Sequence, residues 1–355
     1  MEFQKLKRFY KNKKVLVTGN TGFKGFWIFL MLKFLGAKVI GYSLPLKRND
    51  NFIFYKSLKK FYKKSTVYDD VINKKKLSKS INLFKPQIIF HFAAQSLVID
   101  SQKNPKNTLE TNLIGTNNII DICLKTKSIK SLVIATSDKC YLNTGKKKIF
   151  NEDSELGGVE VYSSSKAMCE QLINLYLINN HKKLSFGLSS IRAGNVIGGG
   201  DFSNYRIIPD IIRGFRSKKI FLRNPRHVRP WQHVLDVCYA YLLIPIFHFK
   251  DNDKYNGPYN VGPLEKKLID VMTLTYKFLF ILGQKYKIKI KKEKFIESKL
   301  LILDSKKIRK TLKWKPIYDF ETTIKKTAEW YKNFLEKRDI KKFTEIQIKN
   351  YFFNQ

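Results

Sequence analysis

Short apolar runs alternate with segments of helical spacing through the first half of the chain. Runs such as 14–18 (KVLVT) and 131–136 (SLVIAT) are typical of buried strands, whereas 24–36 and 107–125 repeat their apolar residues at helical intervals. Further strands are expected at 37–43, 87–92 and 185–191, and a further helix at 71–84. Strand–helix–strand alternation predicts an α/β protein with a Rossmann-type, doubly wound parallel sheet.

The second half of the chain has a looser pattern. Residues 194–205 are rich in Gly, Asn and Asp and predict a long loop, and short strands such as 285–292 follow among helices. From about residue 335 the chain is rich in lysine, and we expect a frayed, solvated terminal helix there. This half predicts a smaller mixed α/β domain.

A glycine-rich loop, Gly19-Asn20-Thr21-Gly22-Phe23-Lys24-Gly25, follows the first strand and opens the first helix. Glycines allow a tight turn and let the backbone approach a pyrophosphate, while the helix N-terminus offers free N–H groups. The spacing is GxxGxxG, and the alternative is a glycine-rich turn that binds no ligand. We expect dinucleotide binding by Gly19, Gly22, Phe23 and Gly25.

The choice of dinucleotide is open at the end of the second strand. Many NAD-binding sheets place an acidic residue there, whereas this chain has Gly41-Tyr42-Ser43 followed by Lys47 and Arg48. The residues therefore leave NAD and NADP as alternatives. Asp70, after the next short strand, is a candidate for adenine contact or else a turn aspartate.

Tyr162 and Lys166 have the YxxxK spacing, which places both side chains on one face of a helix. A lysine ammonium beside a phenol stabilises the phenolate and lowers the pKa of the tyrosine. Such a tyrosine can take a proton from a sugar hydroxyl while hydride leaves the same carbon. The spacing is common by chance, but its position behind a phosphate loop favours catalysis over a surface pair.

Thr136-Ser137-Asp138-Lys139 ends the predicted strand 131–136 and continues beyond it. Ligands of open α/β sheets bind outside the carboxyl ends of strands, so these residues are candidates for ligand contact. Ser137 is a candidate hydrogen-bond partner of the hydroxyl being oxidised, and Asp138 is a candidate general acid. The alternative is a loop that serves as a helix cap.

The net charge is +39, from 68 Lys and Arg against 29 Asp and Glu. Such an excess raises the alternative of nucleic-acid or anionic-membrane binding. The lysines are scattered in short clusters, however, and Asn, Ile, Phe and Tyr are also abundant. We therefore favour compositional bias over a polyanion-binding surface.

The cysteines and the apolar stretches narrow the class of protein further. The four cysteines lack CxxC spacing, so neither a disulfide framework nor a metal site is expected. The longest apolar stretches, 26–32 and 238–247, are far shorter than a membrane span, and the first residues lack the apolar core of a signal peptide. We expect a cytoplasmic protein without a membrane segment.

Together these motifs resemble the extended short-chain dehydrogenase/reductase family over nearly the whole chain. Further similarities are found in Phe92-Ala93-Ala94-Gln95, Thr111-Asn112, Tyr259-Asn260-Val261-Gly262 and Trp330-Tyr331. The resemblance implies an NAD-binding domain at 1–190, with a return segment near 232–262, and a mostly nucleotide-sugar-binding domain at 191–355. It also implies bound NAD in contact with Ala93, Ala94, Tyr162 and Lys166, and a homo-oligomer that is a dimer or larger.

Within the family, the chain looks like the subgroup of CDP-glucose 4,6-dehydratases. The similar segments are 18–25 (TGNTGFKG), 136–141 (TSDKCY), 162–170 (YSSSKAMCE), 191–202 (IRAGNVIGGGDF) and 229–236 (RPWQHVLD). The pair Asp138-Lys139 distinguishes this subgroup best from other members of the family, since related dehydratases carry Asp-Glu at these positions and simple epimerases lack the pair. The implied reaction oxidises the glucose of CDP-glucose at C4, eliminates water across C5 and C6, and returns hydride to C6.

The resemblance also implies residue roles. In the catalytic set, Ser137 contacts the reacting hydroxyl, Tyr162 is the base tuned by Lys166, Asp138 is the acid, and Lys139 is either the C5 base or a cation that stabilises the enolate. The substrate contacts implied are Gln95, Ser96, Asn195, Arg206 and Arg229, while His233 and Asp236 are expected to be structural. The alternatives are another nucleotide-sugar dehydratase or epimerase, and a nucleic-acid-binding protein that has lost catalysis.

Overall fold

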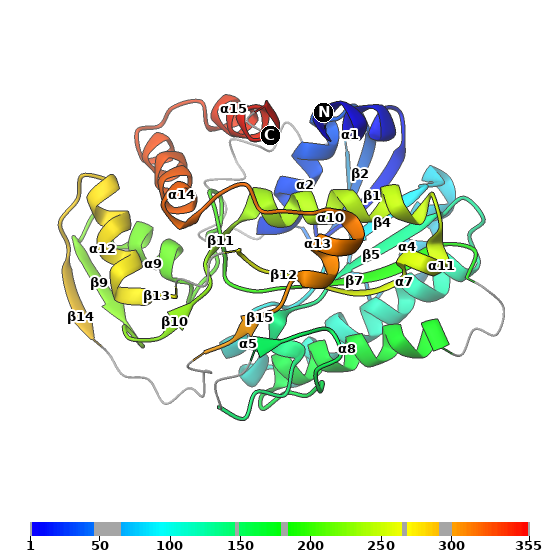
Figure 1. Cartoon of the computed structure of the whole chain (residues 1–355), viewed down its shortest axis with the longest axis horizontal. Helices are drawn as coiled ribbons and strands as arrows, with labels where there is room; N and C mark the ends of the chain where they lie inside the picture. Colours follow the sequence, from blue (N-terminus) through cyan, green and yellow to red (C-terminus); the bar gives the residue numbers. More distant parts are fainter. Residues whose placement is uncertain are drawn as a thin grey trace.

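In the computed structural model, a seven-stranded parallel sheet forms the centre of the protein (Figure 1). The spatial order is β12-β7-β5-β4-β1-β2-β3, and every neighbouring pair is parallel. The strands are β1 Lys14–Thr18, β2 Lys38–Ser43, β3 Thr66–Tyr68, β4 Ile88–His91, β5 Ser131–Ala135, β7 Gly187–Ala193 and β12 Gly257–Val261. The structure describes residues 2–45, 65–145, 149–178, 184–264, 268–290 and 300–353.

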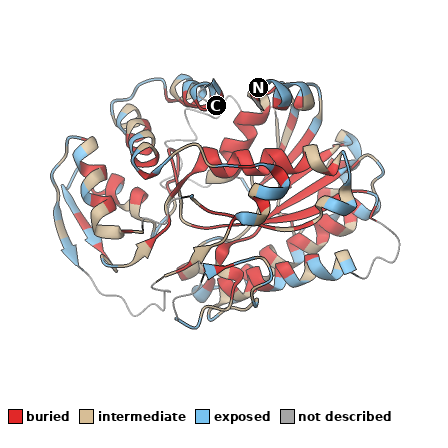
Figure 2. Cartoon of the chain, viewed as in Figure 1, coloured by how far each residue is buried: buried red, intermediate tan, exposed pale blue. Residues whose placement is uncertain are grey.

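Successive strand residues point to opposite faces of the sheet, and each face has its own apolar core. Val15 and Val17 of β1 pack with helices α2 (Phe23–Phe34) and α10 (Val234–His248), whereas Leu16 packs on the opposite face. That opposite face is covered by α4 Lys74–Phe84, α7 Gly115–Leu124 and α8 Val161–Ile178. Figure 2 shows most residues of the central strands buried, and β4, β5 and β7 are buried along their whole length, which explains why their sequences are largely continuous apolar runs.

The predicted strands and helices of the first half match the structure within a few residues. The predicted helix 107–125 is divided into α6 Pro105–Leu109, a π-helical turn η1 (Glu110–Ile114) and α7. The order of strands and covering helices confirms the predicted doubly wound fold class. Within the described residues, no helix has the length and apolar content needed to cross a bilayer.

The second half forms a smaller mixed α/β layer beside the sheet, on the left of Figure 1. Its elements are α9 Ile207–Arg213, β9 Lys219–Leu222, β10 Val228–Arg229, β13 Ile269–Asp270, α12 Val271–Ile281 and β14 Lys287–Ile290. The predicted strand 285–292 corresponds to β14, and its last two residues lie outside the described ones. After the first elements of this layer, the chain returns to the large sheet, to which it adds strand β12 and the covering helix α10. The predicted boundary between the two domains at residue 190 stays a prediction.

The remaining helices, turns and two-residue strands belong to neither of these two groups. They are α1 Glu2–Tyr10, α5 Val98–Lys103, η2 Asp138–Cys140, β6 Ile149–Phe150, β8 Val196–Ile197, β11 Gln232–His233, α11 Asn252–Tyr255, β15 Ile302–Leu303, α13 Lys306–Leu312, α14 Phe320–Leu335 and α15 Ile340–Phe353.

The predicted frayed, solvated terminal helix is wrong for α15. Ile348, Tyr351 and Phe352 are buried, and the Phe352 ring lies 5.3 Å from that of Phe3 in α1. The high lysine content of this segment favoured a solvated helix in the sequence analysis. Which side of the helix is buried depends on its packing beside α1 and α2, and the sequence alone does not give this packing. The helix is therefore part of the core that covers the sheet.

Asp236 and His233 have the structural roles expected of them. The His233 ring accepts a hydrogen bond from the Leu235 N–H and caps α10. The buried Asp236 carboxylate accepts hydrogen bonds from the Ile317 N–H (2.7 Å) and the Tyr351 hydroxyl (2.8 Å). Burial nevertheless raises the pKa of Asp236 to about 7, against the lowering effect of these hydrogen bonds.

The raised pKa predicts a pH-dependent contribution of Asp236 to stability. Because the folded protein retains this proton up to about pH 7, the contribution is greatest below the ordinary pKa of 3.8 and declines as the pH rises. Between these pH values, the difference in unfolding free energy between wild type and Asp236→Asn should fall by roughly 1 kcal/mol per pH unit in urea titrations. Asp319, whose pKa is lowered by its hydrogen bonds to Thr322, is the control: its contribution is complete above pH 3.8, so the difference for Asp319→Asn should stay constant over the same range and decline only at lower pH. A pH-independent difference for Asp236→Asn would contradict the prediction.

Candidate active site

A cavity of about 450 Å³ lies at the carboxyl ends of β1, β4, β5 and β7. It brings together most of the residues predicted for cofactor binding, catalysis and substrate binding. The predicted residues that line it are Gly19, Gly22, Phe23, Gly25, Ala94, Ser96, Ser137, Asp138, Lys139, Tyr162, Lys166, Asn195, Arg206 and Arg229. Asp70, Ala93 and Gln95 do not line this cavity.

The glycine-rich loop rests directly on the backbone that follows β4. Gly19 has a φ of 67°, a left-handed conformation that favours glycine. A Cβ at Gly19 would lie 2.6 Å from the Ala93 nitrogen, and one at Gly25 would overlap the Gly19 carbonyl. Ala93 thus supports the loop from the side of β4, and its contact with the cofactor stays a prediction.

The start of α2 fits the pyrophosphate of a dinucleotide. Gly22 is the N-cap residue and provides no side-chain hydrogen bond to the first turn. The N–H groups at this helix end are therefore available to an anion, which the helix dipole also favours. Gly19 and Gly25 pack against backbone atoms so closely that neither position has room for a side chain, which keeps this turn tight, as dinucleotide-binding loops require.

At the end of β2, the Ser43 hydroxyl is hydrogen bonded to the Thr21 hydroxyl of the glycine-rich loop at 2.6 Å. Beyond β3, the Asp70 carboxylate accepts a hydrogen bond from the Ile72 N–H at 3.0 Å. This geometry supports the alternative of a turn aspartate, and adenine contact stays a prediction. Lys47 and Arg48, which left NADP as an alternative, lie outside the described residues.

Tyr162 and Lys166 are buried on one face of α8, beside the end of β5. The Lys166 ammonium donates a hydrogen bond to the Ala135 carbonyl at 3.2 Å. Ser137, two residues further along the chain, faces Tyr162, and its hydroxyl lowers the pKa of the phenol. The structure therefore places the three residues predicted for the oxidation in one corner of the cavity.

The predicted lowering of the Tyr162 pKa is not found. Burial raises the pKa of Tyr162 to about 12, and this effect exceeds the opposite influences of Ser137 and Arg206. Burial also lowers the pKa of Lys166. The i, i+4 spacing correctly predicted that the two side chains lie close together. It could not predict how deeply the phenol is buried, and this burial opposes its ionisation.

Asp138 and Lys139 lie on the 3-10 turn η2, which begins directly after Ser137. The Asp138 carboxylate is buried and accepts a hydrogen bond from the Ser137 hydroxyl at 2.9 Å. The carboxylate occupies space that Gly194 after β7 leaves open, since a Cβ on that residue would overlap it. Lys139 is half-buried, and both residues line the cavity.

The predicted substrate contacts divide into residues inside and outside the cavity. Asn195 lines it with a left-handed backbone, and Arg229 lines it from β10. Arg206 forms an ion pair with Asp201 (2.9 Å) and also lines the cavity.

Gln95 is the predicted substrate contact that points elsewhere. Its side-chain amide donates hydrogen bonds to the Leu97 carbonyl and the Thr108 hydroxyl, each at 3.0 Å. The neighbouring Ser96 lines the cavity and accepts a hydrogen bond from Arg206 at 3.5 Å. Gln95 therefore shapes the loop that carries Ser96, and its contact with a sugar stays a prediction.

Lys24 is a cavity residue that the sequence analysis did not single out. It occupies a variable position of the GxxGxxG pattern and lines the same cavity as Asp138 and Lys166. Burial, together with the cations Arg206 and Lys166, lowers the pKa of Lys24 to about 8. Within the described residues its ammonium has no hydrogen bond or ion pair. The sequence signal that could have identified Lys24 is a charged residue within a loop of mostly glycine and small polar residues. The direction of its side chain, however, depends on how the first turn of α2 is formed.

The sheet order, the glycine-rich loop and the Tyr162–Lys166 pair define an extended short-chain dehydrogenase/reductase. The sequence matches the GDP-mannose 4,6 dehydratase family over residues 16–327, and the chain belongs to this family. The resemblance inferred from the motifs is therefore confirmed at the level of the family.

Similar proteins include several nucleotide-sugar enzymes. A CDP-glucose 4,6-dehydratase from Salmonella typhimurium is 33% identical over 352 residues, which cover 97% of this chain and 98% of that protein. The crystal structure of dTDP-glucose 4,6-dehydratase from Bacillus anthracis in complex with NAD is 25% identical, with a TM-score of 0.75 over 92% of this chain and 98% of that chain. The epimerase Mth375 from Methanothermobacter thermautotrophicus has a TM-score of 0.80 at 19% identity, over 96% of this chain and 98% of that chain, which shows a shared fold.

The contact between Gly194 and Asp138 predicts a selective effect of Gly194→Ala. The added methyl group should displace the Asp138 carboxylate and lower nucleotide-sugar turnover by roughly a hundredfold, while dinucleotide affinity stays within about twofold. Turnover and a dinucleotide titration test the two effects separately. Gly262→Ala is the control, because a Cβ there meets its nearest atom at an ordinary 3.4 Å. Equal turnover of the two variants would contradict the prediction.

Proposed function

We propose that this chain converts CDP-D-glucose into CDP-4-keto-6-deoxy-D-glucose and water, with NAD regenerated in each turnover. The observation that supports it most is the presence of Ser137, Asp138 and Lys139 beside Tyr162 and Lys166 in one cavity. The Salmonella typhimurium CDP-glucose 4,6-dehydratase supports the choice of substrate, and the NAD complex of the Bacillus anthracis enzyme supports the choice of cofactor. The activity is that of a hydro-lyase.

In the oxidation, Tyr162 takes the proton of the C4 hydroxyl as the C4 hydrogen leaves as hydride, with Ser137 hydrogen bonded to the same hydroxyl. Bound NAD supplies the hydride acceptor for this step and the hydride donor for the last one. Because burial opposes ionisation of Tyr162, the phenolate requires nearby positive charge. The Arg206 guanidinium lowers the pKa of Tyr162, and the Lys166 ammonium lies one helical turn away.

In the elimination, the new C4 ketone makes the C5 proton acidic. Lys139 is proposed to accept this proton or to stabilise the resulting enolate, and Asp138 to protonate the C6 hydroxyl as it leaves as water. Hydride then returns to C6 and a proton to C5, so the sugar loses one water and no net electrons. The half-buried position of Lys139 is compatible with both roles.

Asn195, Arg206 and Arg229 are proposed to bind the substrate diphosphate. Arginine suits this task because its planar guanidinium forms paired hydrogen bonds to phosphate oxygens. Arg229 is buried at the cavity wall, and Arg206 is held by Asp201 at the start of α9. Burial of Arg229 and the ion pair of Arg206 restrict the orientations of these side chains.

We further propose that the protein is a homo-oligomer that assembles through α8. Met168, Leu175 and Ile178 are exposed apolar residues of this helix at spacings of seven and three, which place them near one face. A monomeric mass in light scattering would contradict this assembly. The cytoplasmic location stays a prediction.

A panel of sugar nucleotides tests the proposed reaction. Protein with NAD should remove one water from CDP-glucose, as measured by mass spectrometry, and leave UDP-, dTDP- and GDP-sugars unchanged. Tyr162→Phe should lower this rate by roughly a thousandfold, because the base is lost while the ring still packs. Water loss from another sugar nucleotide would show that the protein is a dehydratase with a different nucleotide specificity. No water loss at all, with salt-dependent oligonucleotide binding, would favour the nucleic-acid alternative.

Lys139→Met tests the role of Lys139. If Lys139 is the C5 base, the variant should exchange the C5 proton of the 4-keto product with D2O roughly a hundredfold more slowly than wild type. Exchange is followed by NMR. Lys75→Met on the exposed side of α4 is the control, because it removes a lysine charge that does not line the cavity. Unchanged exchange would exclude Lys139 as the base.

A further inference from the structure

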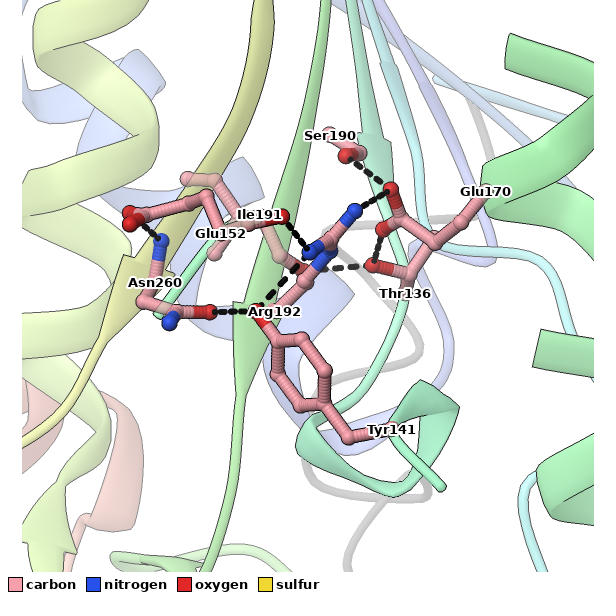
Figure 3. A network of polar contacts seen from close by, with 8 residues as sticks. All are labelled: Thr136, Tyr141, Glu152, Glu170, Ser190, Ile191, Arg192 and Asn260. Atoms are coloured by element: carbon pink, nitrogen blue, oxygen red, sulfur yellow. Dashed lines mark hydrogen bonds and ion pairs between the residues drawn. The ribbon is translucent and has the colours of Figure 1, made fainter. Parts of the chain in front are cut away.

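A buried ion pair between Glu170 and Arg192 lies next to the candidate active site (Figure 3). The Arg192 Nη2 and Glu170 Oε2 atoms are 2.8 Å apart, and the two side chains are 4% and 2% exposed. Although burial alone would lower it, the Glu170 carboxylate raises the pKa of Arg192. Removal of one partner would leave a buried charge without compensation, so this geometry is tightly fixed.

The Glu170 side of the pair is connected to the residues proposed for the oxidation. Glu170 follows Lys166 by four residues and Tyr162 by eight, so the three share one face of α8. Its carboxylate accepts hydrogen bonds from the Thr136 hydroxyl, next to Ser137 in the chain, and from the Ser190 hydroxyl at 2.9 Å. Glu170 therefore fixes α8 relative to the end of β5 and to β7.

The Arg192 side is connected to the residues proposed for the elimination. Arg192 Nη1 donates a hydrogen bond to the Tyr141 hydroxyl at 2.8 Å, and that hydroxyl donates to Asn260 Oδ1 at 2.7 Å. The guanidinium also lies 5.0 Å from the centre of the Tyr141 ring, which stacks on Phe150 at 5.1 Å. Figure 3 shows Arg192 between Glu170 on one side and Tyr141 on the other.

Tyr141 is the residue directly after η2, the turn that carries Asp138 and Lys139. One end of this turn is fixed by Ser137, whose hydroxyl accepts a hydrogen bond from the Lys139 N–H at 3.2 Å. Its other end depends on Tyr141 and on the hydrogen bond from the Gly157 N–H to the Cys140 carbonyl at 2.8 Å. Loss of the Tyr141 hydroxyl would therefore loosen the turn and leave Tyr162 and Lys166 supported through Glu170.

We propose that Tyr141 and Arg192 are positioning residues for the elimination step, and that they hold Asp138 and Lys139 at the distance from the sugar that C5 deprotonation requires. This inference rests on the proposed function. The candidate active site then has two halves: one is supported through Glu170, and the turn η2 is supported through Tyr141 and Arg192. The ion pair between Glu170 and Arg192 joins the two halves. A displacement of about 1 Å at such a site can lower a rate a hundredfold without any loss of a reacting group.

Tyr141→Phe tests this separation, because it removes the hydroxyl and keeps the stacked ring. Formation of reduced NAD on rapid mixing with CDP-glucose reports the oxidation and should change less than about twofold. Exchange of the C5 proton of the 4-keto-6-deoxy product in D2O needs no hydride transfer and reports the elimination half. This exchange should fall at least roughly tenfold, and reduced NAD should accumulate during turnover.

Tyr10→Phe is the matched control. Tyr10 is also fully buried, and its hydroxyl donates one hydrogen bond, to the Leu242 carbonyl at 2.8 Å, far from the turn in the sequence. Both variants are compared by thermal unfolding, so that a loss of stability can be separated from a loss of positioning. Tyr10→Phe should leave the ratio of the two rates unchanged.

Arg192→Lys is a second variant with an independent expectation. A lysine ammonium can keep the charge opposite Glu170 but lacks the fork that reaches Glu170 and Tyr141 together. The same selective fall in C5 exchange is expected. This variant keeps the inference testable if Tyr141→Phe does not fold.

Two results would overturn the positioning inference while the proposed function stands. One is an equal fall of oxidation and C5 exchange in the folded variants, and the other is no change in either. If wild-type protein forms no reduced NAD with any nucleotide sugar, the proposed function fails first, and the inference fails with it. The wild-type result therefore distinguishes the two failures.

Discussion

The parallel register of β1, β4, β5 and β7 is the constraint on which the candidate site depends. Because the four strands run in one direction, the segments that follow them meet at one edge of the sheet. The glycine-rich loop, Ala94, the Ser137–Lys139 segment and Asn195 are such segments, and each lines the cavity. Residues far apart in the sequence are thus brought together by backbone hydrogen bonds that involve none of their side chains.

Burial at this edge has a second effect, on ionisation. Burial in the cavity favours neutral side chains, since it raises the pKa of Tyr162 and lowers the pKa values of Lys24 and Lys166. In a site shielded from water, each additional charge also acts more strongly. Ionisation of Tyr162 in the proposed oxidation therefore depends on positive charge held close to the phenol.

The parallel sheet and part of the cavity lining were predictable from the sequence because both leave local patterns. Apolar runs mark the buried strands, and the GxxGxxG and YxxxK spacings mark a helix start and a helix face. The raised pKa of Tyr162, the direction of Lys24 and the packing of α15 were not predictable in this way, since each depends on burial by distant segments. The Tyr141–Arg192 contact, which joins a turn after β5 to β7, has no local signal either.

The position of β12 has a consequence for how the protein forms on the ribosome. This strand completes the edge of the large sheet beside β7, and α10 covers one of its faces, yet both are synthesised after the first elements of the smaller layer. The earlier strands must therefore wait, with apolar surface exposed, until residue 261 has left the exit tunnel. Nascent chains stalled before that point are expected to need chaperones, although they already contain the entire glycine-rich loop.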